Sequence, residues 1–453
     1  MRPSVLGLGL GTTVGGVVGA KARGATLVPW PTKVRDSFPS ALGGLTGTLS
    51  GVGVDLLIAA ARRPQRIPAA LVATAGIFAV AGVAGKYAAG NVFAGLADKS
   101  RALDPGFADV PADPLVTGSA ASAVPHQTLG REGARFVGTV TSAEDVEFVT
   151  GKTRVIEPVR VFIGVDSAPT VAERVQLAME ELHRTGAFDR ANLLIQAPAG
   201  SGYANSTPVD VLEILTHGDA ASVAIGYGLL PSFLSLGKVA IASQTQRELL
   251  DAIVAELRDR PTKPRLLLYG ESLGAKVQEA AVPAGLLDLD AYGIAQALWV
   301  GTPGGKVADE FHARCADSSV TVDNPSQIPT DLTNRPRVWF LEHDGDPVVR
   351  FRPELLNECP FWLTPNKPRG RNIPEEMTWK PVVTWAQVLV DVLYATDVKP
   401  GDFKSLGHDY RADLGAVVTA AYALDASPEV ADRLETRLRE LEVARAARID
   451  GAA

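Results

Sequence analysis

Short apolar runs alternate with longer amphipathic segments from about residue 158 onward. The apolar runs are 159–165, 192–196, 221–227, 265–269 and 338–341. Parallel strands that are buried on both faces read as continuous apolar runs, and Leu266-Leu267-Leu268 is such a run. Strands that alternate with helices in this way predict an α/β fold, with a mostly parallel sheet and helices on both faces.

Two of the segments between these strands carry a signal for the first turn of a helix. Thr170 and Glu173 have capping-box spacing and precede apolar residues at helical intervals, and Thr245 with Glu248 repeats the arrangement. Residues 209–215 fit a shorter helix. We therefore expect two longer helices that begin at these capping residues.

The first hundred residues follow a different pattern. Three apolar stretches, 5–20, 41–61 and 67–84, are each followed by basic residues. A bilayer span takes about 20 apolar residues, which the second stretch reaches and the third approaches, whereas the first is short and rich in glycine. The many Gly and Ala residues suit close helix–helix contact in lipid. A signal peptide and a soluble helical domain are the alternatives.

Charge is divided unevenly along the chain. Residues 1–101 carry a net charge of +8 and the remainder carries −15, within a formal total of −7. A cationic, apolar head indicates membrane association, and the body has no basic patch with interleaved aromatic residues of the kind that binds nucleic acid. Basic loops flank the stretch 41–61 on both sides. They cannot both be cytoplasmic if that stretch spans, so the side of the membrane stays open.

These patterns divide the chain into three parts. Residues 1–101 are predicted to be a helical, multi-pass domain that anchors the protein to the cell membrane and takes no part in chemistry. Residues 102–157 are rich in Pro, Gly, Ser and Asp, and we interpret them as a linker and a loop that leads into the sheet. Residues 158–453 are the predicted catalytic domain.

The best candidate for chemistry is Gly270-Glu271-Ser272-Leu273-Gly274, which directly follows an apolar strand and precedes a helix start. In a sharp turn from strand to helix, the glycines let neighbouring backbone pass and the serine oxygen stands above the carboxyl edge of the sheet. The helix amino terminus can stabilise negative charge that develops there. Ser272 is the predicted nucleophile, and an inert serine in a tight turn is the alternative.

A serine nucleophile needs a base, and the base needs an orienting acid. With this turn the chain order is serine, acid, histidine. Asp346 lies in the turn after the strand 338–341 and precedes a proline, so it is the predicted acid. Asp344, in the same turn, is the second choice.

Three histidines follow Ser272 in the chain. His343 precedes the acid, which would break the order, and we interpret it as a loop residue. His312 lies in a polar helical segment and is interpreted as a surface residue. His408 follows a glycine and precedes the last apolar helical run, which makes it the predicted base.

The tetrahedral intermediate needs two backbone N–H donors. One is expected from Leu273, directly after the nucleophile, and the other from the loop 197–203, where Ala199 and Gly200 are the candidates. The glycines of this loop could instead suggest a phosphate site. The sequence has no GxxxxGK[ST] motif, which argues against that interpretation.

The segment between Asp346 and His408 is much longer than a bare connection. It is interpreted either as a lid over an apolar substrate pocket or as an irregular loop that aromatic residues pin to the core. Its large aromatic residues are Phe361, Trp362, Trp379 and Trp385. Cys315 and Cys359 are too far apart for a CxxC metal or redox site, and are either unrelated thiols or a single disulfide.

The chain resembles the actinobacterial membrane-anchored α/β-hydrolases, which join an N-terminal membrane domain to a C-terminal hydrolase domain. The resemblance covers most of the chain beyond about residue 120. It rests on the stretches 130–133, 197–203, 270–274, 346–349 and 407–410, which occur in the family's order. It implies an α/β-hydrolase fold and places Ser272, Asp346 and His408 on the family's motif positions. The family usually has about four membrane spans, and this head has fewer clear ones.

Together these features predict a membrane-associated serine hydrolase that cleaves an ester-like lipid or acyl substrate. No metal and no organic cofactor is expected. An acyltransferase with the same triad and a catalytically silent membrane scaffold are the alternatives. The sequence leaves open the acyl chain length, the physiological substrate and the oligomeric state.

Overall fold

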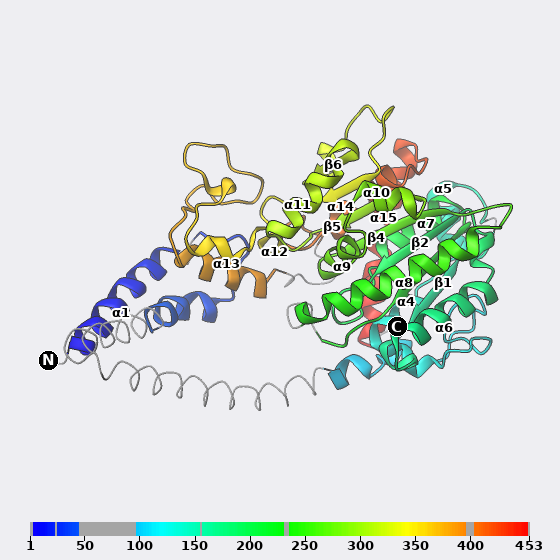
Figure 1. The fold of residues 1–453 in the computed structure, drawn as a ribbon, viewed down its shortest axis with the longest axis horizontal. Coiled ribbons are helices and arrows are strands. Elements are labelled where there is room, and N and C mark those ends of the chain that lie inside the picture. Colours follow the sequence, from blue (N-terminus) through cyan, green and yellow to red (C-terminus); the bar gives the residue numbers. More distant parts are fainter. Residues whose placement is uncertain are drawn as a thin grey trace. The chain divides into compact units, whose positions relative to one another are not determined.

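The structure is a computed structural model that describes residues 3–22, 25–44, 97–154, 156–230, 235–395 and 403–451 (Figure 1). Contacts divide the chain into two compact units. Met1–Gly95 and Asp344–Thr396 form the first, which we call the insertion unit, and Leu96–His343 with Asp397–Ala453 form the second, the sheet unit. This division differs from the predicted boundaries, in which residues 1–101 stand alone.

The sheet unit is built on seven parallel strands in the order β1-β3-β2-β4-β5-β7-β6. The prediction of a parallel α/β sheet is thereby confirmed. The strands are β1 (Val159–Ile163), β2 (Asn192–Ala197), β3 (Ala220–Ile225), β4 (Arg265–Glu271), β5 (Ile294–Val300), β6 (Ser319–Val322) and β7 (Val338–Leu341).

Helices cover both faces of this sheet. On one face α6, α8 and α9 pack together, and α7, α14 and α15 pack on the other, as right-handed crossovers between parallel strands require. The larger helices of the sheet unit are α4 (Gly130–Val137), α5 (Ala143–Thr150), α6 (Val171–Arg184), α7 (Thr207–Leu215), α8 (Val239–Leu257), α9 (Leu273–Ala281), α10 (Leu286–Ala291), α11 (Lys306–Cys315), α14 (Arg411–Ala421) and α15 (Pro428–Ile449).

The strand order reverses direction between β2 and β4. From β2 the chain moves outward to β3, whereas from β4 it moves the other way to β5. β2 and β4 are neighbours, with Ala197 beside Gly270 at their carboxyl ends. Ligands of parallel α/β sheets bind at such a reversal, outside the carboxyl ends of the strands. The fold therefore places the turn of Ser272 at the expected edge.

Helix starts agree with the sequence in one case and differ in the other. Thr170 and Glu173 form both hydrogen bonds of a capping box at the start of α6, as predicted. Thr245 lies inside α8, which begins at Val239, and its hydroxyl donates to the carbonyl oxygen of Ile241. The prediction of a helix start at Thr245 is wrong because a threonine hydroxyl can also bond back to the preceding turn within a helix.

The stretch 102–157 contains structure that the sequence analysis treats as a linker. α4 packs against β1, and α5 packs against α7 and α15. Ser142 and Asp145 close a capping box at the start of α5. The composition of this stretch hides these short helices, and residues from it belong to the sheet unit.

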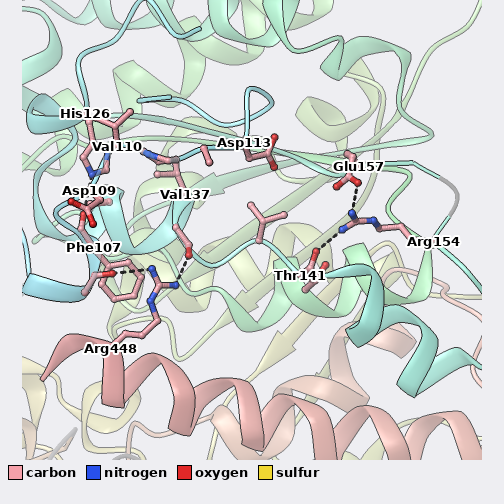
Figure 2. A pocket seen from close by; sticks show the side chains of 16 residues that line it. Phe107, Asp109, Val110, Asp113, His126, Val137, Thr141, Arg154, Glu157 and Arg448 are labelled. Atoms are coloured by element: carbon pink, nitrogen blue, oxygen red, sulfur yellow. Dashed lines mark hydrogen bonds and ion pairs between the residues drawn. The ribbon is translucent and has the colours of Figure 1, made fainter. Parts of the chain in front are cut away.

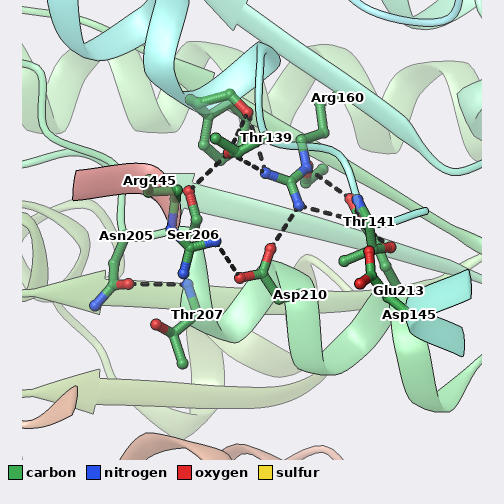
Figure 3. Close-up of polar contacts among 12 residues, drawn as sticks. Thr139, Thr141, Asp145, Arg160, Asn205, Ser206, Thr207, Asp210, Glu213 and Arg445 are labelled. Carbon is green, nitrogen blue, oxygen red and sulfur yellow. Dashed lines mark hydrogen bonds and ion pairs between the residues drawn. The ribbon is translucent and has the colours of Figure 1, made fainter. Parts of the chain in front are cut away.

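A buried cluster of charged groups joins β1 to α7 and α15 (Figure 3). Arg160 of β1 is fully buried and donates to Asp210 at 2.8 Å and to Glu213 at 2.7 and 2.9 Å, both on α7. Arg445 of α15 donates to the other oxygen of Asp210 at 2.7 Å. Thr141 donates to Glu213 through its amide and its hydroxyl. The buried charges are thus paired and hydrogen-bonded, as burial demands.

The insertion unit joins the N-terminal residues to the segment after β7. Its helices are α1 (Pro3–Ala22), residues 32–44, α12 (Pro347–Arg350) and α13 (Val383–Leu393). A Cβ atom on Gly43 would lie 2.8 Å from the carbonyl oxygen of Thr12, and one on Gly19 would lie 2.9 Å from the Cα of Pro39. Glycine therefore lets the first two helices approach closely, as their composition suggests.

Two apolar clusters connect residues 25–44 to the segment 344–396. Ala25 and Leu27 pack with Leu355, Trp362, Leu363, Ile373, Met377 and Val388, and Trp379 and Trp385 lie against this cluster. Val28, Trp30, Phe38 and Leu42 pack with Val34, Val383, Ala386, Val390 and Tyr394. This arrangement favours the interpretation in which aromatic residues pin the long segment, although their partner is the N-terminal part of the chain.

A buried carboxyl group fixes this contact. Asp391 of α13 has no exposed surface and accepts hydrogen bonds from Nε1 of Trp30 at 2.6 Å and from the amide of Leu27 at 3.3 Å. Gln387, one turn earlier, donates to the carbonyl oxygen of Ala25. Burial raises the pKa of Asp391 to about 7, against the opposing effect of these donors.

No helix in the described part of the chain is both long and apolar enough to cross a membrane. Most of the stretch 41–61 and all of the stretch 67–84 lie outside the described residues.

Candidate active site

Ser272 occupies a strained turn between β4 and α9. Its φ of 55° and ψ of −124° are unusual for a residue with a side chain. Such strain costs of order 1–3 kcal/mol and gathers at functional sites, where the surrounding structure enforces it. The amide of Ser272 donates to the carbonyl oxygen of Val300 at 2.8 Å, which fixes the turn against the end of β5. The side chain is half-buried.

The two glycines of the motif are required by close backbone contacts. A Cβ atom on Gly274 would clash with the carbonyl oxygen of Ala197 at the end of β2. A Cβ atom on Gly270 would lie 2.7 Å from the backbone nitrogen and Cα of Ala275. The first turn of α9 therefore lies directly against the end of β2, which is the geometry that the sequence motif predicts.

The amide of Leu273 is the first of α9, and first-turn amides have no acceptor within their own helix. Ala199, in the loop after β2, donates its amide to the carbonyl oxygen of Tyr203 at 2.8 Å. To serve as an oxyanion donor Ala199 would have to give up this bond. Gly200 packs through its carbonyl oxygen against Gly228, where a Cβ atom would clash.

A polar contact ties the loop after β2 to the residue before the nucleophile. Glu271 accepts hydrogen bonds from Asn205 and from the hydroxyl of Tyr269, each at 2.7 Å. Asn205 also caps the start of α7 by accepting from the amide of Thr207 at 2.9 Å. Sequence reasoning missed this contact, because nothing in the motif indicates which way the Glu271 side chain points.

His408 packs against Gly301, the residue after β5. Gly301 directly follows Val300, whose carbonyl oxygen accepts the hydrogen bond from the amide of Ser272. His408 is 7% exposed and stands in a tight loop whose Leu406 and Asp409 form an isolated antiparallel bridge. A Cβ atom on Gly301 would lie 2.6 Å from Cε1 of His408 and 2.7 Å from Cε2 of Tyr410. Ser272 is hydrogen-bonded to Val300 and His408 packs against Gly301, so both residues lie at the carboxyl end of β5.

His343 lies in the loop after β7, as the sequence predicts, and it is fully buried there. Nδ1 contacts the carbonyl oxygen of Gly407 at 2.9 Å and Nε2 contacts Oδ2 of Asp413 at 2.8 Å. Its ring stacks on Tyr410, with ring centres 4.0 Å apart. Chain order excludes His343 as the base, but it gives no signal of this burial.

Asp346 is fully buried and caps α12 in the insertion unit, where Oδ1 accepts from the amide of Val348 at 2.7 Å. Asp344 is partly exposed and already engaged. One oxygen pairs with Arg350 at 3.2 Å and the other accepts from the amide of Arg371 at 3.1 Å. The carboxylate of Asp344 is thus used to shape its own turn.

His312 and Glu279 are further titratable groups of the sheet unit. The ring of His312 lies 3.7 Å from that of Phe340, and burial lowers the pKa of His312 to about 4, so it is not a fully exposed surface residue. Glu279 of α9 is buried and accepts from the hydroxyl of Thr302 at 2.7 Å. Burial raises the pKa of Glu279 to about 8, which leaves this side chain mostly protonated at pH 7. Cys315 and Cys359 are free thiols.

A cavity of about 440 Å³ is lined by none of these residues (Figure 2). Its walls come mainly from the segments before β1 and from Arg448 near the end of α15. Arg154 pairs with Glu157 and donates to the carbonyl oxygen of Thr141, and Arg448 donates to two backbone carbonyls. The arginines of this cavity are therefore already bonded within the protein.

A second cavity has a volume of about 200 Å³. Tyr203 and Asn205 of the loop after β2 line it, together with Arg411 and residues of α15 such as Ala446. Arg411 binds Asp409, the residue after His408, at 2.7 and 3.0 Å. The cavity therefore adjoins both the candidate oxyanion loop and the loop of His408.

Residues 159–438, which include Ser272, Asp346 and His408, match the sequence model of the alpha/beta-hydrolase family. The chain belongs to the alpha/beta-hydrolase family. Membership indicates hydrolytic enzyme activity, in agreement with the parallel sheet and the strained serine turn. Comparisons with curated proteins and with solved structures found no significant match. No group of His, Cys, Asp and Glu side chains in the described part of the chain is suited to hold a metal ion.

Proposed function

We propose that this member of the alpha/beta-hydrolase family is a serine hydrolase. It cleaves an ester-like bond next to a carbonyl group and forms an acyl-enzyme on the way. Ser272 attacks the carbonyl carbon, and His408 takes the serine proton and returns it to the leaving group as its bond to that carbon breaks. Water, which loses a proton to the same histidine, then attacks the acyl-enzyme and releases the free acid and Ser272. Asp346 holds the imidazole in the required tautomer. The amide of Leu273 stabilises the oxyanion together with a donor from the loop after β2.

One observation carries this proposal. Ser272 is held at φ 55° at the strand reversal between β2 and β4, and its amide is bonded to Val300. His408 packs against Gly301, the next residue, so close that a Cβ atom there would clash. A nucleophile and a base at one strand end are what acyl transfer to serine needs. The commitment of Asp344 to Arg350 and Arg371 favours Asp346 as the acid.

We further propose that residues 1–101 associate with a membrane and that the substrate carries a lipid or acyl group. The net charge of +8 and the apolar stretches 41–61 and 67–84 support this part of the proposal.

A fluorophosphonate probe tests the proposed chemistry because it reacts with an activated serine. We expect the full chain to be labelled, and Ser272→Ala and His408→Ala to lose labelling and turnover of a small p-nitrophenyl ester. Ser326→Ala, at an exposed serine distant in sequence from the site, is the matched control and should be labelled like the wild type. Labelling that survives in Ser272→Ala would overturn the choice of nucleophile.

The same experiment separates the alternatives. A silent scaffold would not be labelled at all. An acyltransferase would be labelled, but its ester product would increase when an alcohol acceptor is added, whereas a hydrolase gives mainly the free acid.

A further inference from the structure

We propose that His343, paired with Asp413, is a positioning residue that holds the loop of His408 in place for catalysis. This inference rests on the proposed function, in which His408 is the base. His343 stands two residues beyond β7 and is fully buried, and Asp413 lies in the first turn of α14. The two residues connect the end of β7, which lies between β5 and the edge strand β6, to the helix that follows His408.

The contacts of His343 bracket His408 along the chain. On one side, Nδ1 of His343 lies 2.9 Å from the carbonyl oxygen of Gly407, the residue before His408. On the other side, the amide of His343 donates to the hydroxyl of Tyr410 at 3.2 Å, and the two rings stack. Gly407 has a φ of 61°, a conformation that glycine adopts without strain and that the hydrogen bond helps to fix.

Tyr410 carries this contact to the base itself. Its ring meets that of His408 edge to face, with centres 5.6 Å apart, while its face is stacked on His343. Tyr410 is 1% exposed and packs against Gly301. A shift of the His343 ring would therefore move the aromatic surface on which His408 lies.

Hydrogen-bond chemistry fixes which ring nitrogen of His343 donates to the loop of His408. A carbonyl oxygen can only accept, so Nδ1 of His343 must carry the hydrogen of the bond to Gly407. Nε2 faces a carboxylate oxygen of Asp413, to which the hydroxyl of Ser405 also donates. Both ring nitrogens are therefore engaged, Nδ1 with Gly407 and Nε2 with Asp413, and the hydroxyl of Ser405 lies 3.3 Å from Nε2. A histidine bonded in this way cannot accept a proton from Ser272, which explains why it supports the base and does not replace it.

Two isosteric substitutions separate the contacts of His343. The amide nitrogen of asparagine reaches the place of Nδ1, so His343→Asn keeps the donor to Gly407 and loses the one to Asp413. In His343→Gln the amide nitrogen reaches the place of Nε2, so this variant keeps the contact with Asp413 and loses the donor to Gly407. We expect His343→Phe, which keeps only the stacked ring, to lower kcat for a p-nitrophenyl ester by about 10- to 100-fold with little change in KM, since displacing a catalytic group by about 1 Å can cost 10²-fold. His343→Asn should recover most of that loss and His343→Gln less.

A double-mutant cycle with His408 distinguishes positioning from general damage. If His343 acts through His408, then His343→Phe should have almost no further effect on the small residual turnover in the His408→Ala background. His126 is a matched control: it is 3% exposed, and its Nε2 contacts the carbonyl oxygen of Phe107 at 2.9 Å. His126→Phe should lower the melting temperature but leave kcat of the folded protein unchanged.

Each outcome has a distinct meaning. Wild-type kcat in a folded His343→Phe variant, or equal losses with and without His408, would overturn the positioning role while leaving the triad intact. If His343→Phe does not fold, the order of the Asn and Gln variants decides, and a Gln variant more active than Asn would refute the role of the Gly407 contact. Full activity in His408→Ala would instead refute the proposed function.

Discussion

Ser272 and its neighbours form a site whose geometry depends on single atoms. Ser272 has a strained backbone, and its amide is hydrogen-bonded to Val300 at the end of β5. Gly274 lies against the end of β2 and Gly301 follows β5, and neither position has room for a Cβ atom. A substitution at any of these positions would move the proposed nucleophile or the proposed base without touching the substrate. This makes the site sensitive to small changes, as catalytic geometry generally is.

At this scale the assignment of the acid can be tested by a pair of substitutions. Asp346→Asn should lower turnover by roughly 10⁴-fold, as loss of the orienting carboxylate does in the serine-protease triad. Asp344→Asn should cost much less, because Asp344 already pairs with Arg350. Steady-state rates with a p-nitrophenyl ester measure both, and the melting temperature controls for folding. A larger loss in Asp344→Asn would show that the wrong carboxylate was chosen.

The sequence predicts the backbone geometry of the site better than its side-chain contacts. The glycines around Ser272 have the physical reason that the motif implies, and chain order leaves His408 as the predicted base. The contacts of His343 and Glu271 depend on side-chain directions across the sheet, for which a single sequence has no period or spacing signal. The Ala199 amide is similar, because its bond to Tyr203 is set by the local loop conformation.

Among the elements, β1 and α7 are joined by ionic contacts as well as by apolar packing. Arg160→Met should lower the free energy of unfolding by about 3–5 kcal/mol, because it leaves the carboxylates of Asp210 and Glu213 buried without their main partner. Chemical denaturation measures the change. Arg101→Met is the control, since the pair of Arg101 with Asp166 is largely exposed and should be worth less than about 1 kcal/mol. Equal effects of the two variants would contradict this account.

The buried acid of α13 gives the insertion unit a dependence on pH. An acid whose pKa is higher in the folded protein binds more protons when folded, so its stabilisation is greatest at low pH. For Asp391 that stabilisation should be lost as the pH rises from the ordinary value of about 3.9 to about 7. Asp391→Asn removes the titration, and its melting temperature should therefore fall less than that of the wild type between pH 5 and pH 7.

Glu376→Gln, at an exposed acid of the same unit, controls for the loss of a charge. Its melting temperature should keep the wild-type dependence on pH. If the melting temperature of Asp391→Asn also keeps the wild-type dependence on pH, the buried carboxyl group does not titrate in this range.

Elements were predicted best where burial makes the pattern simple. The strand 338–341 matches β7, and the strands near β1 to β4 differ from the structure by a few residues. β5 and β6 were not predicted, because Gln296 interrupts the apolar run of β5 and β6 is a short, partly exposed edge strand. α4 and α5 were missed because eight-residue helices in a Gly- and Pro-containing stretch give too few turns for a period.

At the scale of the whole molecule, the division of the chain is the main departure from the sequence analysis. Apolar stretches and charge suggested that the head is a separate anchor. In the structure residues 25–44 share two apolar clusters and the bonds to Asp391 with the segment 344–396. Asp346, the proposed acid, lies near the start of that segment. Contacts between residues about 360 positions apart leave no local signal, so no reading of single segments could have found them.

This arrangement changes the expected result of removing the head. Deletion of residues 1–101 should expose Leu355, Trp362 and Val388 and should deprive Asp391 of its donors. We therefore expect cleavage within 344–396 under limited proteolysis and a loss of esterase activity through Asp346. Deletion of residues 1–24 alone should have a smaller effect on both properties, because the clusters begin at Ala25 and only the packing of α1 on residues 32–44 and α13 is lost. If the protein lacking residues 1–101 resists protease and hydrolyses a small ester at the full-length rate, the N-terminal residues are dispensable for the insertion unit and act only outside the catalytic domain.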